Sequence, residues 1–239
     1  MAARCSQEGV LTLTAAAQVD GEKAGGPRSR KGAQTRSRLL EAAKAIFEKD
    51  GFLEARISDI AERAGLSHGS FYHYFDSKEQ IFREVAKAIE DELEAPVDAV
   101  IFDPESTATP RERIREGIRR HLVSYRDEAA IMGIIEQVSR YDDHVRAVRA
   151  EQRDRSQQQI AESIRQLQLR GLADPKLDPN LAIAALGAMT QRFPELWLVE
   201  HTHDFDFDEA VDQLSRLFSN ALGIAEVVPR KTRTRRASA

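Results

Sequence analysis

"GLSHGSFYHYFDSKE" (residues 65–79) combines side chains that neither a buried core nor a solvated loop would hold together. A core would exclude the polar tips of residues 72–74, and a loop has no use for Phe71 and Phe75. The two phenylalanines are four positions apart and share one face of a helix. The pattern therefore predicts a short helix with an apolar side that packs and a polar side that stays exposed.

A second short helix is predicted just before this one, over residues 58–64. The two are separated by Gly65, Leu66 and Ser67. Glycine tolerates a left-handed turn, Leu66 can fill the space between the helices, and Ser67 can cap the second helix. Two short helices joined in this way are the signature of a helix-turn-helix, whose second helix enters the major groove of DNA.

The polar side of residues 68–75 suits a nucleic acid. Small residues at its start allow a close approach, and hydroxyl groups, an imidazole and free N–H groups can bond phosphate oxygens and base edges. Lys78, which begins the next helix, can pair with a phosphate. The alternative is that Tyr72 and Tyr74 are ordinary half-buried helix aromatics.

Residues 35–82, "TRSRLLEAAKAIFEKDGFLEARISDIAERAGLSHGSFYHYFDSKEQIF", resemble the DNA-binding domain of the tetracycline-repressor (TetR) family. The run G-[LV]-S-x-G-[ST]-[FL]-Y-x-[HY]-F-x-[SN]-K-[ED] is matched at every position. The resemblance covers about a fifth of the chain. It implies that the polar side of the short helix faces DNA while Phe71 and Phe75 pack behind it.

One position departs from the family pattern. Members often place Thr or Ser where this chain has Arg56, to cap the first short helix and touch a phosphate. Arginine keeps the phosphate contact but cannot cap in the same way, so Ser58 is the expected cap. The residues predicted to contact DNA are Arg56, Ser67, His68, Gly69, Ser70, Tyr72, His73, Tyr74 and Lys78.

The rest of the chain is also predicted to be helical. Its 239 residues include only 13 glycines and 8 prolines, which is typical of a mostly helical protein. Capping pairs such as Thr109 with Glu112 mark helix starts, and Pro194 is expected to kink a helix that opens at Asp178. We expect an all-α fold of about nine helices, with an N-terminal three-helix DNA-binding domain and a C-terminal helical ligand-binding and dimerisation domain.

Composition divides the chain into four parts. Residues 1–27 are expected to be a disordered leader, because polar residues interrupt the stretch that faintly resembles a signal peptide. Residues 28–82 are the predicted DNA-binding domain, and residues 83–226 the predicted effector-binding and dimerisation domain. Residues 227–239 carry five basic residues and no acid, and are expected to be a disordered tail.

Charge is segregated along the chain. Residues 28–82 carry 10 basic and 8 acidic side chains, whereas residues 83–226 carry 18 and 28. An acidic body behind a mildly basic head would keep the body away from phosphates. The basic run at 28–38 is either an arm along the DNA backbone or minor groove, or a solvated linker.

The predicted partners are double-stranded DNA with a palindromic operator and a second copy of the chain. One recognition helix contacts few bases, so a two-fold dimer is needed to read two half-sites. In the TetR family the last two helices usually pair with their symmetry mates, although such stripes can also pack within one subunit. The predicted dimer residues are Leu181, Ala185, Ala188, Leu196, Leu214, Leu217, Phe218 and Ala221.

A small-molecule effector is the third predicted partner, because TetR-like proteins usually hold one among their central helices. An acyl-CoA, a steroid or an aromatic compound would suit a lining of methionine, aromatic and aliphatic residues. The alternative is that these positions simply fill the core. The predicted ligand-binding residues are Ile118, Leu122, Tyr125, Met132, Ile135, Val138, Met189, Phe193 and Trp197.

Motifs of catalytic, nucleotide-binding and metal sites are absent from the sequence or have a simpler explanation. We find no P-loop, dinucleotide fingerprint, H-E-x-x-H or nucleophile elbow, and "EHTHD" (200–204) is better explained as a solvated turn than as a metal site. No cofactor, catalytic residue or membrane-spanning run is predicted, and the single Cys5 fits a reducing, cytoplasmic location. A ligand-responsive repressor therefore ranks above an effector-free activator or architectural protein, and both rank above an enzyme.

Overall fold

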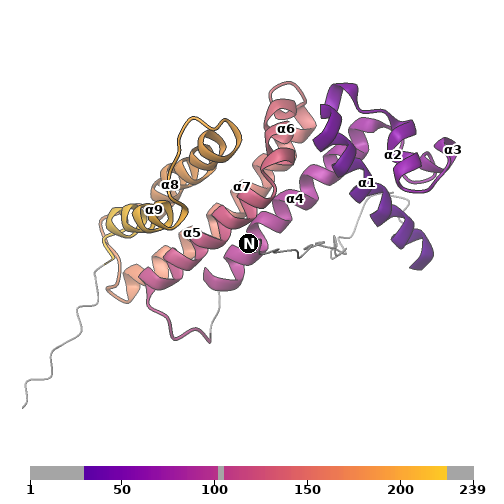
Figure 1. Ribbon diagram of the computed structural model, residues 1–239. Helices are drawn as coiled ribbons and strands as arrows, with labels where there is room; N and C mark the ends of the chain where they lie inside the picture. Colours follow the sequence, from indigo (N-terminus) through magenta and orange to yellow (C-terminus); the bar gives the residue numbers. More distant parts are fainter. Residues whose placement is uncertain (1–29, 102–104, 225–239) are drawn as a thin grey trace, which may run out of the picture. The chain divides into compact units, whose positions relative to one another are not determined.

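The computed structural model describes residues 30–101 and 105–224, and every regular element in these ranges is a helix (Figure 1). The all-α prediction is therefore confirmed. The predicted leader (1–27) and tail (227–239) lie outside the described residues. In chain order the elements are α1 (Arg30–Glu54), α2 (Ile57–Arg63), α3 (His68–Phe71), α4 (Lys78–Ile101), α5 (Pro110–Asp127), α6 (Ala129–Ser139), α7 (Asp143–Leu169), α8 (Pro179–Pro194), the π-helix η1 (Glu195–Val199) and α9 (Phe207–Ala221).

The described residues form two compact units. Unit 1 contains the described residues up to Asp91 together with Ala130–Ala150. Unit 2 contains Glu92–Ala129, apart from residues 102–104, and the described residues from Glu151 onward. Helices α4 and α7 each have residues in both units. The predicted domain boundary between residues 82 and 83 stays a prediction.

The core of unit 1 is aromatic where α1 meets the start of α4. Phe47 and Phe82 are fully buried with their rings edge to face at 5.0 Å, and Phe52 adds a third ring 4.8 Å from Phe82. Gly51 has φ of 74°, but the helix continues to Glu54, so Gly51 is a kink inside α1.

Ion pairs connect three helices in a second region of unit 1. The guanidinium of Arg149 on α7 donates to Glu90 of α4 at 2.7 Å and to Glu136 of α6 at 2.5 Å. The Arg149 side chain is only 16% exposed. Burial alone would lower the pKa of Arg149, but hydrogen bonds and charge from both carboxylates raise it instead. This ion cluster ties three helices together within unit 1.

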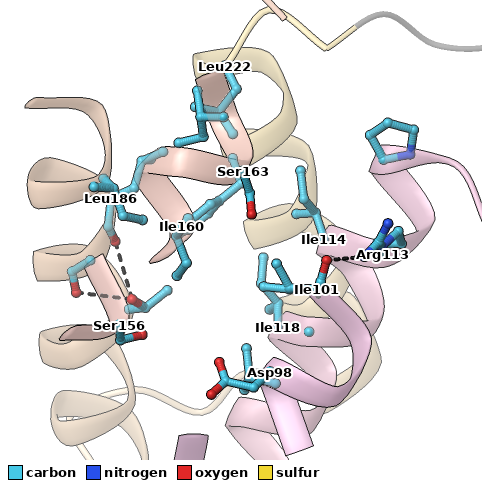
Figure 2. A pocket seen from close by; sticks show the side chains of 18 of the residues that line it. Asp98, Ile101, Arg113, Ile114, Ile118, Ser156, Ile160, Ser163, Leu186 and Leu222 are labelled. Atoms are coloured by element: carbon cyan, nitrogen blue, oxygen red, sulfur yellow. Dashed lines mark hydrogen bonds between the residues drawn. The ribbon is translucent and has the colours of Figure 1, made fainter. Parts of the chain in front are cut away.

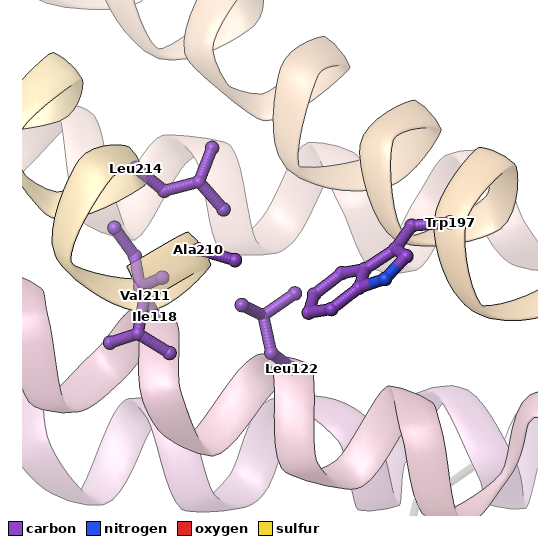
Figure 3. Packing of buried hydrophobic residues seen from close by; sticks show 6 residues of the cluster. All are labelled: Ile118, Leu122, Trp197, Ala210, Val211 and Leu214. Atoms are coloured by element: carbon purple, nitrogen blue, oxygen red, sulfur yellow. The ribbon is translucent and has the colours of Figure 1, made fainter. Parts of the chain in front are cut away.

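Unit 2 is built on α5, which packs against α9. The predicted capping box at Thr109 and Glu112 is present and starts α5. Glu112 accepts hydrogen bonds from the backbone and the side chain of Thr109, which lowers the pKa of its carboxyl. Figure 3 shows the apolar residues that join α5, η1 and α9: Ile118, Leu122, Trp197, Ala210, Val211 and Leu214.

Pro194 marks a change of helix type. Proline has no N–H to donate to the carbonyl four residues earlier, which here belongs to Thr190. His121 of α5 occupies that carbonyl instead, with its Nε2 at 3.1 Å. After Pro194 the chain continues as the π-helix η1, in which Glu195 and Trp197 are buried. The predicted kink is therefore a switch from α- to π-helix.

Candidate nucleic-acid interface and ligand cavity

The turn between α2 and α3 has the predicted geometry. Gly65 adopts φ of 67°, and the backbone N–H of Leu66 returns to the carbonyl of Ala61 at 2.8 Å. Ser67 accepts a hydrogen bond from the backbone N–H of Ser70 at 3.2 Å. Its hydroxyl also bonds that of Ser70 at 2.8 Å. The start of α3 is thus fixed by its own side chains.

The helix and the turn after it have one buried and one open side. Phe71 and Phe75 are fully buried, with ring centres 5.7 Å apart. Tyr72 is 49% exposed, and its ring meets that of His68 edge to face at 5.4 Å. The phenylalanines therefore anchor the segment from behind while the aromatic and imidazole rings beside them face outward.

Most residues predicted to touch DNA are accessible within unit 1. Arg56, Ser67, His68, Gly69, Tyr72 and His73 are exposed, and Ser70, Tyr74 and Lys78 are half-buried. A methyl group added at Gly69 would meet no atom within 4 Å. Nothing inside unit 1 therefore requires glycine there, whereas a partner that approaches closely would.

Lys78 has a structural task. Its ammonium donates to the backbone carbonyls of Phe52, Leu53 and Ala55 at 2.7, 3.0 and 3.0 Å. An ammonium has three hydrogens, so all of them serve the end of α1 in this conformation. A phosphate contact by Lys78 stays a prediction, and the sequence offered no sign of a clamp between residues so far apart.

Some basic residues near the start of α1 bond to other helices of unit 1, and others are exposed. Arg36 pairs with Glu84 and stacks 5.0 Å from the Phe75 ring, and burial lowers its pKa. Arg38 donates to the carbonyl of Ala64 at the end of α2. These two arginines hold the helix-turn-helix in place, while Arg30 and Lys31 are exposed.

The expected replacement cap for α2 does not form. Arg56 occupies the N-cap position without a side-chain hydrogen bond to the helix. The Ser58 hydroxyl donates to Asp59 at 2.9 Å, because Ser58 already lies inside the first turn. The prediction of a Ser58 cap is wrong, and α2 starts uncapped by any side chain.

Unit 2 contains a partly open cavity of about 650 Å³, which Figure 2 shows from close by. That volume is in the range that binds one small molecule. Its walls come from the last part of α4 and from α5, α7, α8 and α9. Most of the lining is apolar: Val97, Ile101, Ile114, Ile118, Ile160, Ile164, Leu167, Ile183, Leu186, Phe218 and Leu222.

Polar and charged side chains also line the cavity, and they differ in whether they have partners. Arg113 donates to the carbonyl of Ile101, and Asp98 points its carboxylate into the space in Figure 2. Burial in this wall raises the pKa of Asp98. His121 bonds the Thr190 carbonyl, which only accepts, so its Nε2 carries the proton. Burial lowers the pKa of His121 and keeps the ring neutral.

Only part of the predicted ligand-binding set lines this cavity. Ile118 lines the cavity. Leu122 and Trp197 instead belong to the hydrophobic cluster of unit 2, and Met189 and Phe193 pack against that cluster. Tyr125 is buried in unit 2, and Met132, Ile135 and Val138 are buried in unit 1. The helical spacing of Ile160 and Ile164 was visible in the sequence, but spacing cannot tell a stripe that fills the core from one that lines a hole.

The predicted dimer residues fall into two groups. Leu181 and Leu217 are 72% and 55% exposed, and Ala185, Ala188 and Ala221 are exposed as well. Leu214 is buried, and Leu196 and Phe218 are half-buried. The exposed members form apolar stripes on α8 and α9 that no described residue of the same unit covers.

The histidine-rich turn at residues 200–204 has no metal geometry. His201 and His203 are both exposed, and the ring of His203 stacks on Phe205. Among the described residues, no three metal-ligating side chains gather in one place. In the same ranges, no helix is long and apolar enough to cross a membrane.

Comparison with known proteins agrees with this geometry. Residues 39–85 match the model for "Bacterial regulatory proteins, tetR family". The repressor KstR2 of Mycolicibacterium smegmatis is 30% identical over 161 residues, covering 63% of this chain and 71% of that protein. KstR2 of Mycobacterium tuberculosis is 38% identical over 104 residues, 39% of this chain and 50% of that relative, so the match spans only half of its length.

Solved structures share the fold over most of the chain. A Mesorhizobium loti protein described as a TetR-family transcriptional regulator aligns with a TM-score of 0.69 at 20% identity, covering 81% of this chain and 98% of that one. Bacillus subtilis FadR in complex with stearoyl-CoA aligns with a TM-score of 0.63 at 18% identity, covering 77% and 97%. Motif, helix order and the long mycobacterial match agree: the chain belongs to the TetR family of bacterial regulatory proteins.

Proposed function

We propose that the protein is a ligand-responsive transcriptional repressor that binds a palindromic operator as a homodimer and is released by a small amphipathic or hydrophobic effector. The observation that carries this proposal is the apolar cavity of about 650 Å³ in unit 2 of a chain whose unit 1 holds an exposed helix-turn-helix. A DNA-binding protein without a ligand has no need of such a space, because empty apolar volume costs stability.

The DNA-binding step rests on the open side of α3. Ser67, His68 and Gly69 present hydroxyl, imidazole and backbone groups at the start of the helix, where N–H groups favour a phosphate or a base edge. Tyr72 and His73 extend this surface by one further turn. In the docking that we propose, the start of α3 enters the major groove and Phe71 and Phe75 keep it at a fixed depth.

The effector step rests on chain connectivity. Helix α4 begins at Lys78, directly after the recognition segment, and ends among the residues that line the cavity. An effector that favours another position of Val97, Asp98 or Ile101 would shift α4 and with it the spacing of the two recognition helices in a dimer. Such an effector must bind the DNA-free conformation more tightly than the DNA-bound one.

The effector class is suggested by the lining and by one structural neighbour. Bacillus subtilis FadR has been solved with stearoyl-CoA, and an acyl chain would suit the isoleucine-rich walls of this cavity. A long-chain acyl-CoA is therefore the first compound to test. A DNA-binding activator or architectural protein without an effector is the alternative.

A binding assay tests the proposal in two stages. Duplexes selected from a random library with the full chain should share an inverted repeat, and Tyr72→Ala should weaken binding to the selected duplex by about tenfold or more. Tyr141→Ala is the matched control, because Tyr141 is an exposed tyrosine in unit 1 outside the recognition segment. Stearoyl-CoA should then lower the DNA affinity of the unmodified protein.

Two results would count against the proposal. Unchanged affinity of the Tyr72 variant would remove the docking of α3 in the groove. DNA affinity that ignores every compound able to raise the melting temperature of the protein would favour the effector-free alternative.

A further inference from the structure

Asp98 places a carboxylate in the cavity wall, and it belongs to neither the predicted DNA-binding residues nor the predicted dimer residues. It lies on α4 between two apolar lining residues, Val97 and Ile101. Within the described parts of the chain, no side chain or backbone N–H makes a hydrogen bond or ion pair with its oxygens. Figure 2 shows the carboxylate directed into the open space rather than toward a neighbouring helix.

An acidic group in such a place is costly. The lining near it is rich in isoleucine, and burial raises the pKa of Asp98 because the charged form is poorly solvated there. Asp98 is half-buried, so its carboxylate loses part of its hydration without gaining a partner in the described residues. A residue of this kind in a cavity is therefore a candidate for ligand recognition.

The described cations that line the cavity do not pair with Asp98. Three arginines also line the cavity: Arg113, Arg153 and Arg170. Arg113 is directed to the backbone carbonyl of Ile101, and neither of the others comes within ion-pair distance of Asp98. Ser156 of α7 lies at the same end of the cavity in Figure 2, but no hydrogen bond joins it to Asp98.

A second acceptor belongs to the same lining. The proton of His121 is on Nε2, where it is donated to Thr190, so a neutral ring leaves Nδ1 as a lone-pair acceptor. Neither a carboxylate nor such an imidazole nitrogen can bond an acceptor group on a ligand. Both can bond a hydroxyl or an ammonium group.

We propose that Asp98 accepts a hydrogen bond from a hydroxyl or ammonium group of the effector, so that the effector is an apolar molecule carrying a donor at one end. This inference rests on the effector role proposed above for the cavity. It narrows that role, because a plain hydrocarbon chain that ends in a methyl group would leave Asp98 unpaired. Asp98 is then the residue that selects among compounds of similar size and apolar surface.

Three probes with the same carbon chain test the inference by calorimetric titration of the full-length protein. Dodecylamine, dodecanol and laurate differ only in the end group, and each is used below its micellar concentration. Asp98→Leu should weaken dodecylamine and dodecanol by about tenfold or more, because a hydrogen bond to a charged acceptor is lost. Laurate should bind the variant as tightly as it binds the unmodified protein, or more tightly.

A conservative variant and a control sharpen the design. Asp98→Asn keeps an acceptor oxygen but loses the charge, so it should weaken dodecylamine more than dodecanol. Asp91→Asn removes a carboxylate of the same helix that pairs with Lys87 and does not line the cavity, and it should leave all three affinities unchanged. If Asp98→Leu fails to fold, the comparison of the two asparagine variants decides.

The outcomes separate this inference from the function on which it rests. Equal weakening of all three probes would give Asp98 a structural role. No change in any of them would mean that the end group of the ligand does not contact Asp98. Either result overturns the inference and leaves the cavity as an effector site. Failure of every probe to bind both the unmodified protein and the variants overturns the inference together with the proposed effector site for chain-like ligands.

Discussion

At the scale of single residues, a substitution at Gly69 should change DNA binding without lowering the stability of the fold. Its backbone φ is not in the left-handed region, and a methyl group there would meet no atom within 4 Å. Gly69→Ala should leave the free energy of unfolding unchanged or raise it by about 0.5 kcal/mol, because alanine favours a helix. The same change should weaken DNA binding, since the added carbon lies on the side that approaches the groove.

Gly65→Ala provides the contrast, measured by denaturant unfolding and by DNA titration. Gly65 has φ of 67°, and an added carbon would lie 3.0 Å from the Arg38 guanidinium, so this change should lower stability by about 1 kcal/mol or more. If Gly69→Ala binds DNA as the unmodified protein does, the close approach of α3 is wrong.

His121 predicts a pH dependence of stability. Burial lowers its pKa in the folded state below the ordinary value of 6.5, so the unfolded chain binds the proton more readily. The contribution of a neutral His121 is complete above about pH 6.5 and is lost as the pH falls below it. His121→Gln keeps a donor for Thr190 and should lose less stability between about pH 7.5 and about pH 5.5 than the unmodified protein. Equal losses in the two proteins would show that the ring is protonated without cost.

Residue types predicted the local contacts well but not the distant ones. Ser67 capping α3 and Thr109 capping α5 follow from side chains that bond a backbone three positions away. The Lys78 clamp on Phe52–Ala55 joins positions over twenty residues apart, and no spacing rule reaches that far. The hydrogen bond between His121 and the Thr190 carbonyl is also non-local: Pro194 leaves that carbonyl without its usual donor, and only the packing of α5 on α8 supplies a partner.

At the scale of helices, the Arg149 ion cluster should be the strongest tie among α4, α6 and α7 in unit 1. Arg149→Met leaves Glu90 and Glu136 close together without a cation, which should destabilise the protein by about 3 kcal/mol. Arg146→Met is the matched control on the same helix. Arg146 is 55% exposed and pairs with Asp143 three residues away, a surface pair worth about 0.5 kcal/mol. Denaturant unfolding of the two variants measures the difference, and equal losses would make the cluster an ordinary surface contact.

Helix positions were predicted better than helix faces. Helix α2 lies within one residue of the predicted range 58–64, and α5 starts where the capping pair Thr109 and Glu112 predicted it. The sequence of α7 did not show that residues 156–167 border a cavity or that Arg149 is largely buried between two acidic side chains. Which neighbour a face meets is decided by the other helices, so a single sequence leaves it open.

At the scale of the whole molecule, the exposed apolar stripes of α8 and α9 are the surface that we propose for the dimer contact. Leu181 and Leu217 are far more exposed than leucines in a finished core, and the alanines beside them permit helices to approach closely. A contact with a second copy would bury both stripes and give the two recognition helices that a palindromic operator needs. The predicted dimer therefore follows from the same surface that one chain leaves uncovered.

Leu217→Glu tests this assembly by placing a charge in the middle of the proposed contact. The variant should sediment as a monomer at micromolar concentration, while its helical content and melting of the isolated chain stay close to normal, because Leu217 is outside the core of unit 2. DNA affinity should fall by more than tenfold, since one half-site contact is lost at the same time as the two-fold symmetry. Leu169→Glu is the control: Leu169 is 80% exposed at the end of α7 and lies on neither stripe, so its variant should remain a dimer and bind DNA normally. A Leu217 variant that stays dimeric would place the contact elsewhere, and a monomeric variant with full DNA affinity would remove the need for two recognition helices.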